Sequence, residues 1–454
     1  MGLLSLNSSS KAFASSFLQW PQSLNRSIKF SEIHPIVFES DDWGLCGEGR
    51  DQQVQSDLVS KGYVDIDSNF LAPMYKNTLE SESDLDNLSN SLAKFKDRLG
   101  RSPIFTANMV VSNPDFERIK QNRFSQYFAI PISKGFPTGW HDWATTVRGW
   151  KKAINRKVWL PEYHGFSHFN YRNWIRGLGK GDQRLMDFFN RSMVTYSVRF
   201  RVLSEYGVHI GNRWDFQSFG EQYSDICAGF DIFNSLFGRF PRTTIPPNNV
   251  WNPDTYRAFL KSKVRFIQSE KESLKSNLGA RNTNISLIPD VFNSILLRFS
   301  SLCKQYRNVH LEYNDENESA AVVSSTNCFV SGVPAIVGTH RVNYVSGVDP
   351  NLPRKNLKRL ENYLHSVLEN ENVVFLSDNE LFQLRSFGVS REEFGDEILL
   401  RNFRQSPVAF KLKTNKYEVQ DLTNLSKIQI DSISDDYIRL TVPSRRTISL
   451  VSRV

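Results

Sequence analysis

The sequence predicts an α/β protein that contains a (β/α) barrel followed by a small all-β module. From about residue 34, short apolar runs alternate with segments whose apolar residues recur every three or four positions. This alternation is typical of parallel strands joined by helices. After about residue 395 the helical spacing stops, and short β-branched runs alternate with Asp, Ser, Asn and Pro clusters, as in antiparallel sheets. The length of 454 residues exceeds one ordinary core and suffices for a barrel and a smaller domain.

Strands and helices can be placed in chain order within the barrel segment. The apolar runs predict strands at residues 36–38, 103–111, 157–160, 208–210, 264–267, 335–337 and 373–375. Helical spacing and end signals predict helices at residues 83–99, 182–207, 252–263 and 354–369. Asp182 and Asn252 are the expected N-caps of the second and third helices. Gly100 and Gly207 are the expected C-terminal ends of the first and second.

The chain is expected to have three parts: an N-terminal extension (1–33), the barrel (34–395) and the β module (396–454). The extension contains no acidic residue before Glu32 and no continuous apolar segment, so no secretory signal is predicted. The strands of the β module are expected at residues 398–400, 408–412, 428–430, 437–442 and 447–451.

Composition and charge exclude several classes of protein. A chain with 40% hydrophobic and 23% charged residues is not a disordered tail. The 56 basic and 48 acidic residues give a net charge of +8, and no dense basic run or recognition motif indicates a nucleic-acid partner. No apolar run reaches the roughly 18 residues of a membrane span. The four cysteines, Cys46, Cys227, Cys303 and Cys328, are far apart in the sequence, which favours free thiols. Free thiols are typical of a cytoplasmic protein, which is expected here to be soluble or peripheral to a membrane. The oligomeric state is not predicted.

Three of the predicted strands end in ionisable residues. The first leads into residues 39–44, the second into residues 162–168, and a late strand leads directly into His340. The first segment holds two adjacent carboxylates, and the second holds two histidines four residues apart. Each feature also has an ordinary interpretation, since adjacent acids are common in solvated turns, and loop or strand-end histidines are often structural.

In a parallel barrel the carboxyl ends of the strands share one rim, so these side chains could converge: Asp41, Asp42, His164, His168 and His340. Two histidines and one carboxylate are a familiar set of protein ligands for a catalytic divalent metal. The remaining aspartate and histidine would then supply a base and an acid.

The order of these motifs resembles the polysaccharide deacetylase family, also described as NodB-homology or carbohydrate esterase family 4 proteins. Asp41 and Asp42 are similar to the first family motif, Thr-Phe-Asp-Asp-Gly, with Trp43 inserted before the glycine. His164 and His168 match the motif His-Ser/Thr-x-x-His, with Gly165 in place of the hydroxyl residue. The late strand that ends in His340 is similar to the motif Leu-x-His, and residues 242–251 are a distorted match to the arginine motif. The resemblance covers about residues 34–390 and implies the distorted barrel of this family.

The resemblance also implies roles for individual residues. Asp42, His164 and His168 would bind a divalent metal, usually zinc in this family. Asp41 would be the general base and His340 the general acid. Four residues would contact the sugar: Arg242, Pro246, Asn249 and Trp251. Trp251 has two interpretations, a platform on which the sugar stacks or a packed core residue. The implied reaction is metal-dependent removal of an N-acetyl or similar acyl group from an amino sugar of a polysaccharide, or of a lipid-linked or nucleotide-linked precursor.

Two alternatives remain open from the sequence. A glycosidase on a related barrel would need two carboxylates on either side of the scissile bond, and Asp41 with Glu162 is the pair that the sequence offers. A barrel that has lost its chemistry would instead bind carbohydrate or act as a scaffold.

Overall fold

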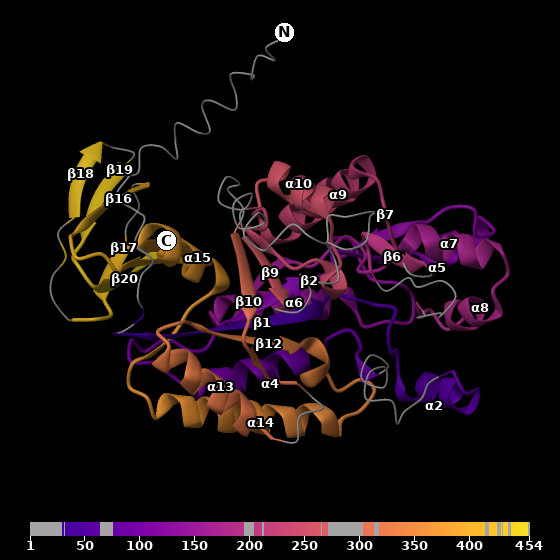
Figure 1. The fold of residues 1–454 in the computed structure, drawn as a ribbon, viewed down its shortest axis with the longest axis horizontal. Helices are drawn as coiled ribbons and strands as arrows, with labels where there is room; N and C mark the ends of the chain where they lie inside the picture. The colour runs from indigo at the N-terminus through magenta and orange to yellow at the C-terminus, as the bar shows by residue number, and fades with distance from the viewer. Residues whose placement is uncertain are drawn as a thin grey trace, which may run out of the picture. The chain divides into compact units, whose positions relative to one another are not determined.

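The chain is described by a computed structural model, shown in Figure 1. The described residues are 30, 32–63, 76–194, 204–210, 213–264, 266–270, 303–312, 317–413, 417–424, 428, 430–434 and 437–452. Most of the predicted N-terminal extension, residues 1–29, lies outside this part. Contacts divide the described chain into two compact units, Phe30–Asn379 and Glu380–Val454.

The first unit is built on a parallel sheet of the predicted (β/α) type. Neighbouring strands are hydrogen-bonded in the order β10-β9-β8-β5-β2-β1-β12-β11, and β13 pairs with the start of β1. All of these pairs are parallel. The strand bounds are β1 His34–Trp43, β2 Phe105–Met109, β5 Trp159–Tyr163, β8 Thr243–Thr244, β9 Phe266–Glu270, β10 Cys303–Arg307, β11 Val309–His310, β12 Ala335–His340 and β13 Val373–Phe375.

One extended segment nearly closes the sheet into a barrel. β10 pairs with β9, and β11 pairs with β12 at the other end of the strand order. Only Asn308 separates β10 from β11, so residues 303–310 bridge the two edges. The predicted fold class, a distorted (β/α) barrel with a C-terminal all-β module, is therefore confirmed.

Helices surround this sheet, and several begin at the caps that their sequences supply. Figure 1 shows α4, α13 and α14 on one side of the sheet and α9 and α10 on another. Asn252 caps α10 and Asp182 caps α8, as expected. The bounds of the helices in this unit are α2 Gln52–Ser60, α4 Glu82–Ala93, α5 Phe116–Gln121, α6 Trp143–Asn155, α7 Tyr171–Gly179, α8 Gln183–Phe189, α9 Phe219–Phe237, α10 Pro253–Lys261, α13 Ser319–Val330 and α14 Asn351–Leu368. Most of α15 (Asp378–Phe387) belongs to the second unit. No helix in the described ranges is both long and apolar enough to cross a membrane.

The apolar core of the barrel unit lies between the sheet and the helices, whereas the barrel interior is polar. Alternate residues of β1 divide between the two. Phe38 is fully buried and packs edge-on against Tyr363 of α14. Glu39, next in the strand, is equally buried but bonds to Arg307 of β10 at 2.8 Å. The barrel interior is therefore filled by hydrogen-bonded polar side chains.

Two predicted helices are shorter than expected. The helix predicted over 83–99 ends at Ala93, because the Asp97 carboxylate accepts the backbone N–H groups of Leu99 and Arg101 and folds this segment into a turn. The helix predicted over 182–207 ends at Phe189, and Ser192 then takes a left-handed conformation (φ 57°). The last three apolar positions of that prediction lie outside the described residues: Tyr196, Phe200 and Leu203.

Two short hairpins lie outside the barrel sheet. The strand predicted at 208–210 is present as β6 (Gly207–Ile210), but it pairs antiparallel with β7 (Arg213–Phe216). β3 (Ser112–Pro114) and β4 (Ala129–Pro131) form the other hairpin. Among the described residues, the three barrel strands that the sequence did not predict are β8, β10 and β11.

The second unit confirms the antiparallel prediction. Its strands form two sheets, in the orders β14-β15-β20-β17 and β16-β19-β18. A separate apolar cluster that includes Leu400, Leu440 and Leu450 fills its core. The bounds are β14 Val389–Phe394, β15 Glu397–Asn402, β16 Val408–Lys413, β17 Tyr417–Asp421, β18 Ile430–Ser434, β19 Tyr437–Val442 and β20 Arg446–Ser452.

Candidate metal centre

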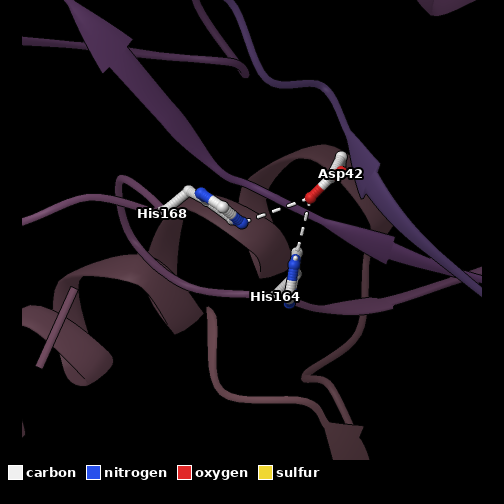
Figure 2. Close-up of side chains that lie close together, drawn as sticks. All are labelled: Asp42, His164 and His168. Carbon is white, nitrogen blue, oxygen red and sulfur yellow. Dashed lines mark ion pairs between the residues drawn. The ribbon is translucent and has the colours of Figure 1, made fainter. Parts of the chain in front are cut away.

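Two strands of the barrel bring Asp42, His164 and His168 together (Figure 2). Asp42 lies at the end of β1, and His164 follows the last residue of β5. Asp42 Oδ1 lies 3.3 Å from His164 Nε2 and 3.2 Å from His168 Nε2. One potential ligand atom from each of the three residues lies within 4.8 Å of those of the other two. All three residues are buried, so the group lies largely protected from bulk water.

Two of the three residues have strained backbones. Asp42 has φ 76° and His168 has φ 68°, in the left-handed backbone region that residues other than glycine seldom adopt. Such conformations cost about 1–3 kcal/mol each and persist where the surrounding structure imposes them. Their occurrence at two of three clustered side chains indicates that the fold holds this arrangement against local preference.

The donor chemistry of the cluster fits a cation. His164 Nδ1 lies 2.9 Å from the Ile245 carbonyl, which can only accept, so Nδ1 bears a proton and Nε2 faces Asp42. A carboxylate and imidazole lone pairs repel unless a proton or metal ion lies among them. Burial disfavours the Asp42 carboxylate, but hydrogen bonds to His164 and His168 outweigh it and hold the Asp42 pKa well below its usual range. Two imidazoles and one carboxylate match the ligand set of a divalent metal such as zinc.

A buried network holds the other oxygen of Asp42. Asn77 Nδ2 approaches Asp42 Oδ2 at 3.4 Å, and Arg341 donates from Nε to Asn77 Oδ1 at 3.0 Å. Arg341 is fully buried and also bonds Glu80 at 3.1 Å and the Leu45 carbonyl at 2.9 Å. This network fixes the turn that follows β1 and leaves Oδ1 facing the two histidines.

Asp41 lies beside this cluster in a different environment. Arg307 donates to both of its oxygens, at 2.7 Å to Oδ1 and 2.8 Å to Oδ2, and Asn108 donates to Oδ1 at 2.8 Å. Burial alone would raise the pKa of Asp41, but the Arg307 guanidinium outweighs it and holds the pKa below its usual range. The Cδ atom of Arg307 comes so close to Gly338 that a Cβ there would lie 2.6 Å away, which explains the glycine in β12.

His340 ends β12 in register with Asp41 on β1. Its Nε2 lies 3.7 Å from Asp41 Oδ2, its Nδ1 lies 2.6 Å from Glu312 Oε1, and the side chain is 40% exposed. Burial favours the neutral ring, but the Glu312 carboxylate, with Asp41 and Asp42, outweighs burial and raises the pKa of His340 to about 10. His340 is therefore protonated near neutral pH.

Sequence reasoning missed Arg307 and Glu312. Arg307 contacts Asp41 from β10, a strand whose polar sequence carries no apolar signal. Glu312 follows β11 closely, so it also comes from a strand end, but that strand has only two residues. A search for ionisable residues after every short extended segment could have found Glu312.

The predicted sugar-contacting loop lies against the histidine segment. The Ile245 carbonyl contacts His164, and a Cβ on Gly165 would come within 2.8 Å of Pro247. Arg242 and Asn249 are partly exposed, whereas Pro246 is buried. Trp251 is only 8% exposed, which fits a packed tryptophan better than an open stacking platform. Sugar contact by these four residues stays a prediction.

Glu162, the second carboxylate of the glycosidase alternative, has a structural role. It is 1% exposed, accepts the backbone N–H groups of Arg242 and Thr243 at 2.7 and 3.0 Å, and pairs with Arg239 at 3.0 Å. These contacts attach β8 and the segment before it to β5. The geometry therefore gives the glycosidase alternative no support from this residue.

No protein-family model matches the sequence, and no curated protein is significantly similar to it. Among solved structures, the chain is similar to 4-alpha-glucanotransferase from Thermococcus litoralis, at 10% identity and a TM-score of 0.36 over 78% of this chain and 40% of that chain. It is similar to a Mycobacterium smegmatis protein assigned as a polysaccharide deacetylase, at 9% identity and a TM-score of 0.37 over 81% and 94%. It is also similar to a family 4 acetyl xylan esterase from Clostridium thermocellum, at 12% identity and a TM-score of 0.28 over 77% and 91%. TM-scores in this range do not establish a relationship by themselves.

Proposed function

We propose that this protein is a metal-dependent hydrolase that removes an N-acetyl or similar acyl group from an amino sugar of a polysaccharide or its precursor, as a divergent relative of the polysaccharide deacetylases. The observation that supports this most directly is the grouping of Asp42, His164 and His168 within 4.8 Å. Asp41 and His340 lie beside it on adjacent strands, with opposite charges.

The three clustered residues would hold a divalent cation, with zinc the best match to two nitrogen donors and one oxygen donor. When bound, such an ion supplies Lewis-acid polarisation of an acyl carbonyl and activation of water. The chain contributes the buried setting and the fixed orientation of His164, whose Nδ1–H donates to the Ile245 carbonyl.

Asp41 is the proposed general base, and its hydrogen bonds favour one of its two oxygens as the reacting atom. Oδ1 accepts from both Arg307 and Asn108, whereas Oδ2 accepts from Arg307 and faces His340. A carboxylate oxygen has two lone-pair sites, so Oδ2 retains one. Asp41 is ionised at neutral pH because Arg307 lowers its pKa, and Oδ2 therefore takes the proton of the attacking water.

His340 is the proposed general acid. Glu312 holds Nδ1, so Nε2 faces the Asp41 side of the site, and the 40% exposed ring is accessible to substrate. As the water oxygen bonds to the acyl carbon and the C–N bond breaks, Nε2–H passes its proton to the departing sugar nitrogen. The products are then a free amino sugar and a carboxylic acid.

Metal content and acetate release test this proposal together. The purified chain, loaded with zinc or cobalt, should release acetate from N-acetylglucosamine oligomers, and a chelator should stop the release. Metal should be lost from Asp42→Asn and retained by Asp41→Asn. A wild-type chain that binds no divalent cation would overturn the proposal, and one that binds the ion but releases no acetate from any acetylated amino sugar would restrict it to a binding function.

A further inference from the structure

Three consecutive backbone N–H groups, the last of which is that of His168, point at one carboxylate. Glu205 Oε1 accepts from Phe166 N at 3.0 Å, and Oε2 accepts from Ser167 N at 3.0 Å and from His168 N at 2.9 Å. Glu205 is fully buried, and its own carbonyl accepts from Gln217 Nε2 at 2.7 Å. Successive N–H groups that converge in this way form an anion-binding concavity, and here a side chain of the same protein fills it.

Glu205 also explains the unusual glycine in the histidine motif. Gly165 has φ 115°, and a Cβ at that position would lie 2.4 Å from Glu205 Oε2. A residue with a side chain, such as the serine or threonine of the resembling family, would collide with this carboxylate. Gly165 and Glu205 therefore depend on each other sterically.

We propose that Glu205 is a positioning residue for the candidate metal centre, holding His168 in the left-handed conformation that directs Nε2 towards Asp42. This assignment rests on the proposed function, because it concerns the orientation of a metal ligand. His168 has φ 68° and lies in no helix or strand. The hydrogen bond from its backbone N–H to Glu205 therefore holds this conformation. Water does not replace the Glu205 carboxylate as the acceptor of these N–H groups, since Ser167 is fully buried and His168 is only 5% exposed.

The energetic argument is the cost of unmet hydrogen bonds. If Glu205 is removed, three buried N–H groups lose their acceptor, and buried donors left unpaired destabilise the conformation that leaves them so. The segment would escape this cost by relaxing towards ordinary backbone angles, and His168 would then turn away from Asp42. Loss of residues that orient metal ligands typically weakens metal affinity by about 10- to 100-fold.

Asp97 offers a matched control. Its carboxylate also accepts three backbone N–H groups, from Leu99 at 2.8 Å, Arg101 at 2.9 Å and Phe375 at 2.9 Å, and it is 5% exposed. Phe375 pairs with Ile36 at the start of β1, whereas the metal centre lies at the end of that strand. Asp97→Asn therefore perturbs an equivalent set of bonds remote from the site.

The test compares Glu205→Gln with Asp97→Asn in the full chain, using Co²⁺ alone as the probe. Glu205→Gln should weaken Co²⁺ binding by about 10- to 100-fold and change the visible Co²⁺ spectrum. Asp97→Asn should lower the unfolding midpoint but leave affinity and spectrum as in the wild type. Wild-type affinity and spectrum in Glu205→Gln, or an equal loss in both variants, would overturn the proposal.

A second measurement does not need the metal. Hydrogen–deuterium exchange over residues 165–169 should be faster in Glu205→Gln and unchanged in Asp97→Asn, because Glu205 protects those amides. Unchanged exchange in Glu205→Gln would show that Glu205 does not hold this segment. If the wild type binds no Co²⁺, the proposed function fails, and the exchange result still decides whether Glu205 holds the loop.

Discussion

Replacement of Arg307 by methionine should destabilise the barrel unit strongly. Arg307 is 2% exposed and donates to Glu39 at 2.8 Å and to the two oxygens of Asp41 at 2.8 and 2.7 Å. Methionine fills much of the same space without a charge, so the variant leaves two buried carboxyl groups without their cation. Breaking a buried ion pair by removing one partner costs about 3–5 kcal/mol, and we expect a loss of that order in the free energy of unfolding.

The size of this effect should depend on pH, with a sign that can be worked out. In the wild type Arg307 outweighs burial and lowers the pKa of Asp41. The ionised Asp41 therefore stabilises the folded protein above the ordinary pKa of 3.8, and this stabilisation is lost as pH falls below that value. In the variant burial dominates and raises the pKa instead. Stability is then greatest below the ordinary pKa and falls by about 1.4 kcal/mol per pH unit for each such group as pH rises towards the raised value. The difference between the two proteins should therefore grow with pH.

Urea unfolding followed by tryptophan fluorescence suits this measurement. Eight of the nine tryptophans lie at residues 43–251, within the unit Phe30–Asn379, so the signal reports mainly on that unit. The matched control is Arg148→Met, whose guanidinium pairs with Glu82 at 2.5 Å but is 55% exposed, so that its removal should change the free energy of unfolding very little. A loss in Arg307→Met no larger than in the control, or one that is equal at about pH 5 and about pH 8, would refute the reasoning.

Three further outcomes follow from the site and its surroundings. Asp41→Asn should retain Co²⁺ binding and lose acetate release, whereas Asp42→Asn should lose both; full activity in the former would show that the base is assigned wrongly. Because Glu312 raises the pKa of His340 to about 10, Glu312→Gln should move the alkaline limit of acetate release towards neutral pH, and an unmoved limit would contradict the acid assignment. Hydrogen bonds from two basic residues of α6 lower the pKa of Glu82 to about 2, a stabilisation present above its ordinary 4.5 and lost as pH falls through 2. Glu82→Gln should therefore be less stable than the wild type near neutral pH and equal to it in strong acid, as measured by urea unfolding across pH.

The barrel strands that could be predicted from the sequence are those with apolar residues. β1 and β12 were evident because a buried apolar run precedes their polar ends. β8 has two threonines, and β10 has the sequence of Cys303–Arg307, with polar residues at the positions that face the interior. Rules of hydrophobic periodicity assume an apolar barrel interior. These rules therefore miss strands that line a polar barrel interior.

The candidate site divides in the same way between local and distant residues. His164 and His168 are four residues apart, and a motif of this length is visible in a single sequence. Arg307 lies 266 residues from Asp41, and Glu312 lies 28 residues from His340. Nothing local to these residues indicates their partners, because the partnership is created by the closing of the barrel between β9 and β12.

The polar interior that hides β10 from sequence analysis also supports the proposed chemistry. Burial raises the pKa of Glu39 in spite of Arg307, and burial together with Glu39 raises the pKa of Asp378 well above its usual value. Asp378 accepts from Gln268 Nε2 at 2.7 Å and from Gln305 Nε2 at 2.9 Å, and its hydrogen bond with Glu39 favours its uncharged form. With these two carboxyl groups inclined to the neutral form, the single charge of Arg307 is left to balance Asp41, which keeps a lowered pKa. An apolar interior would provide no such cation, and desolvation would protonate Asp41 and remove its capacity to act as a base.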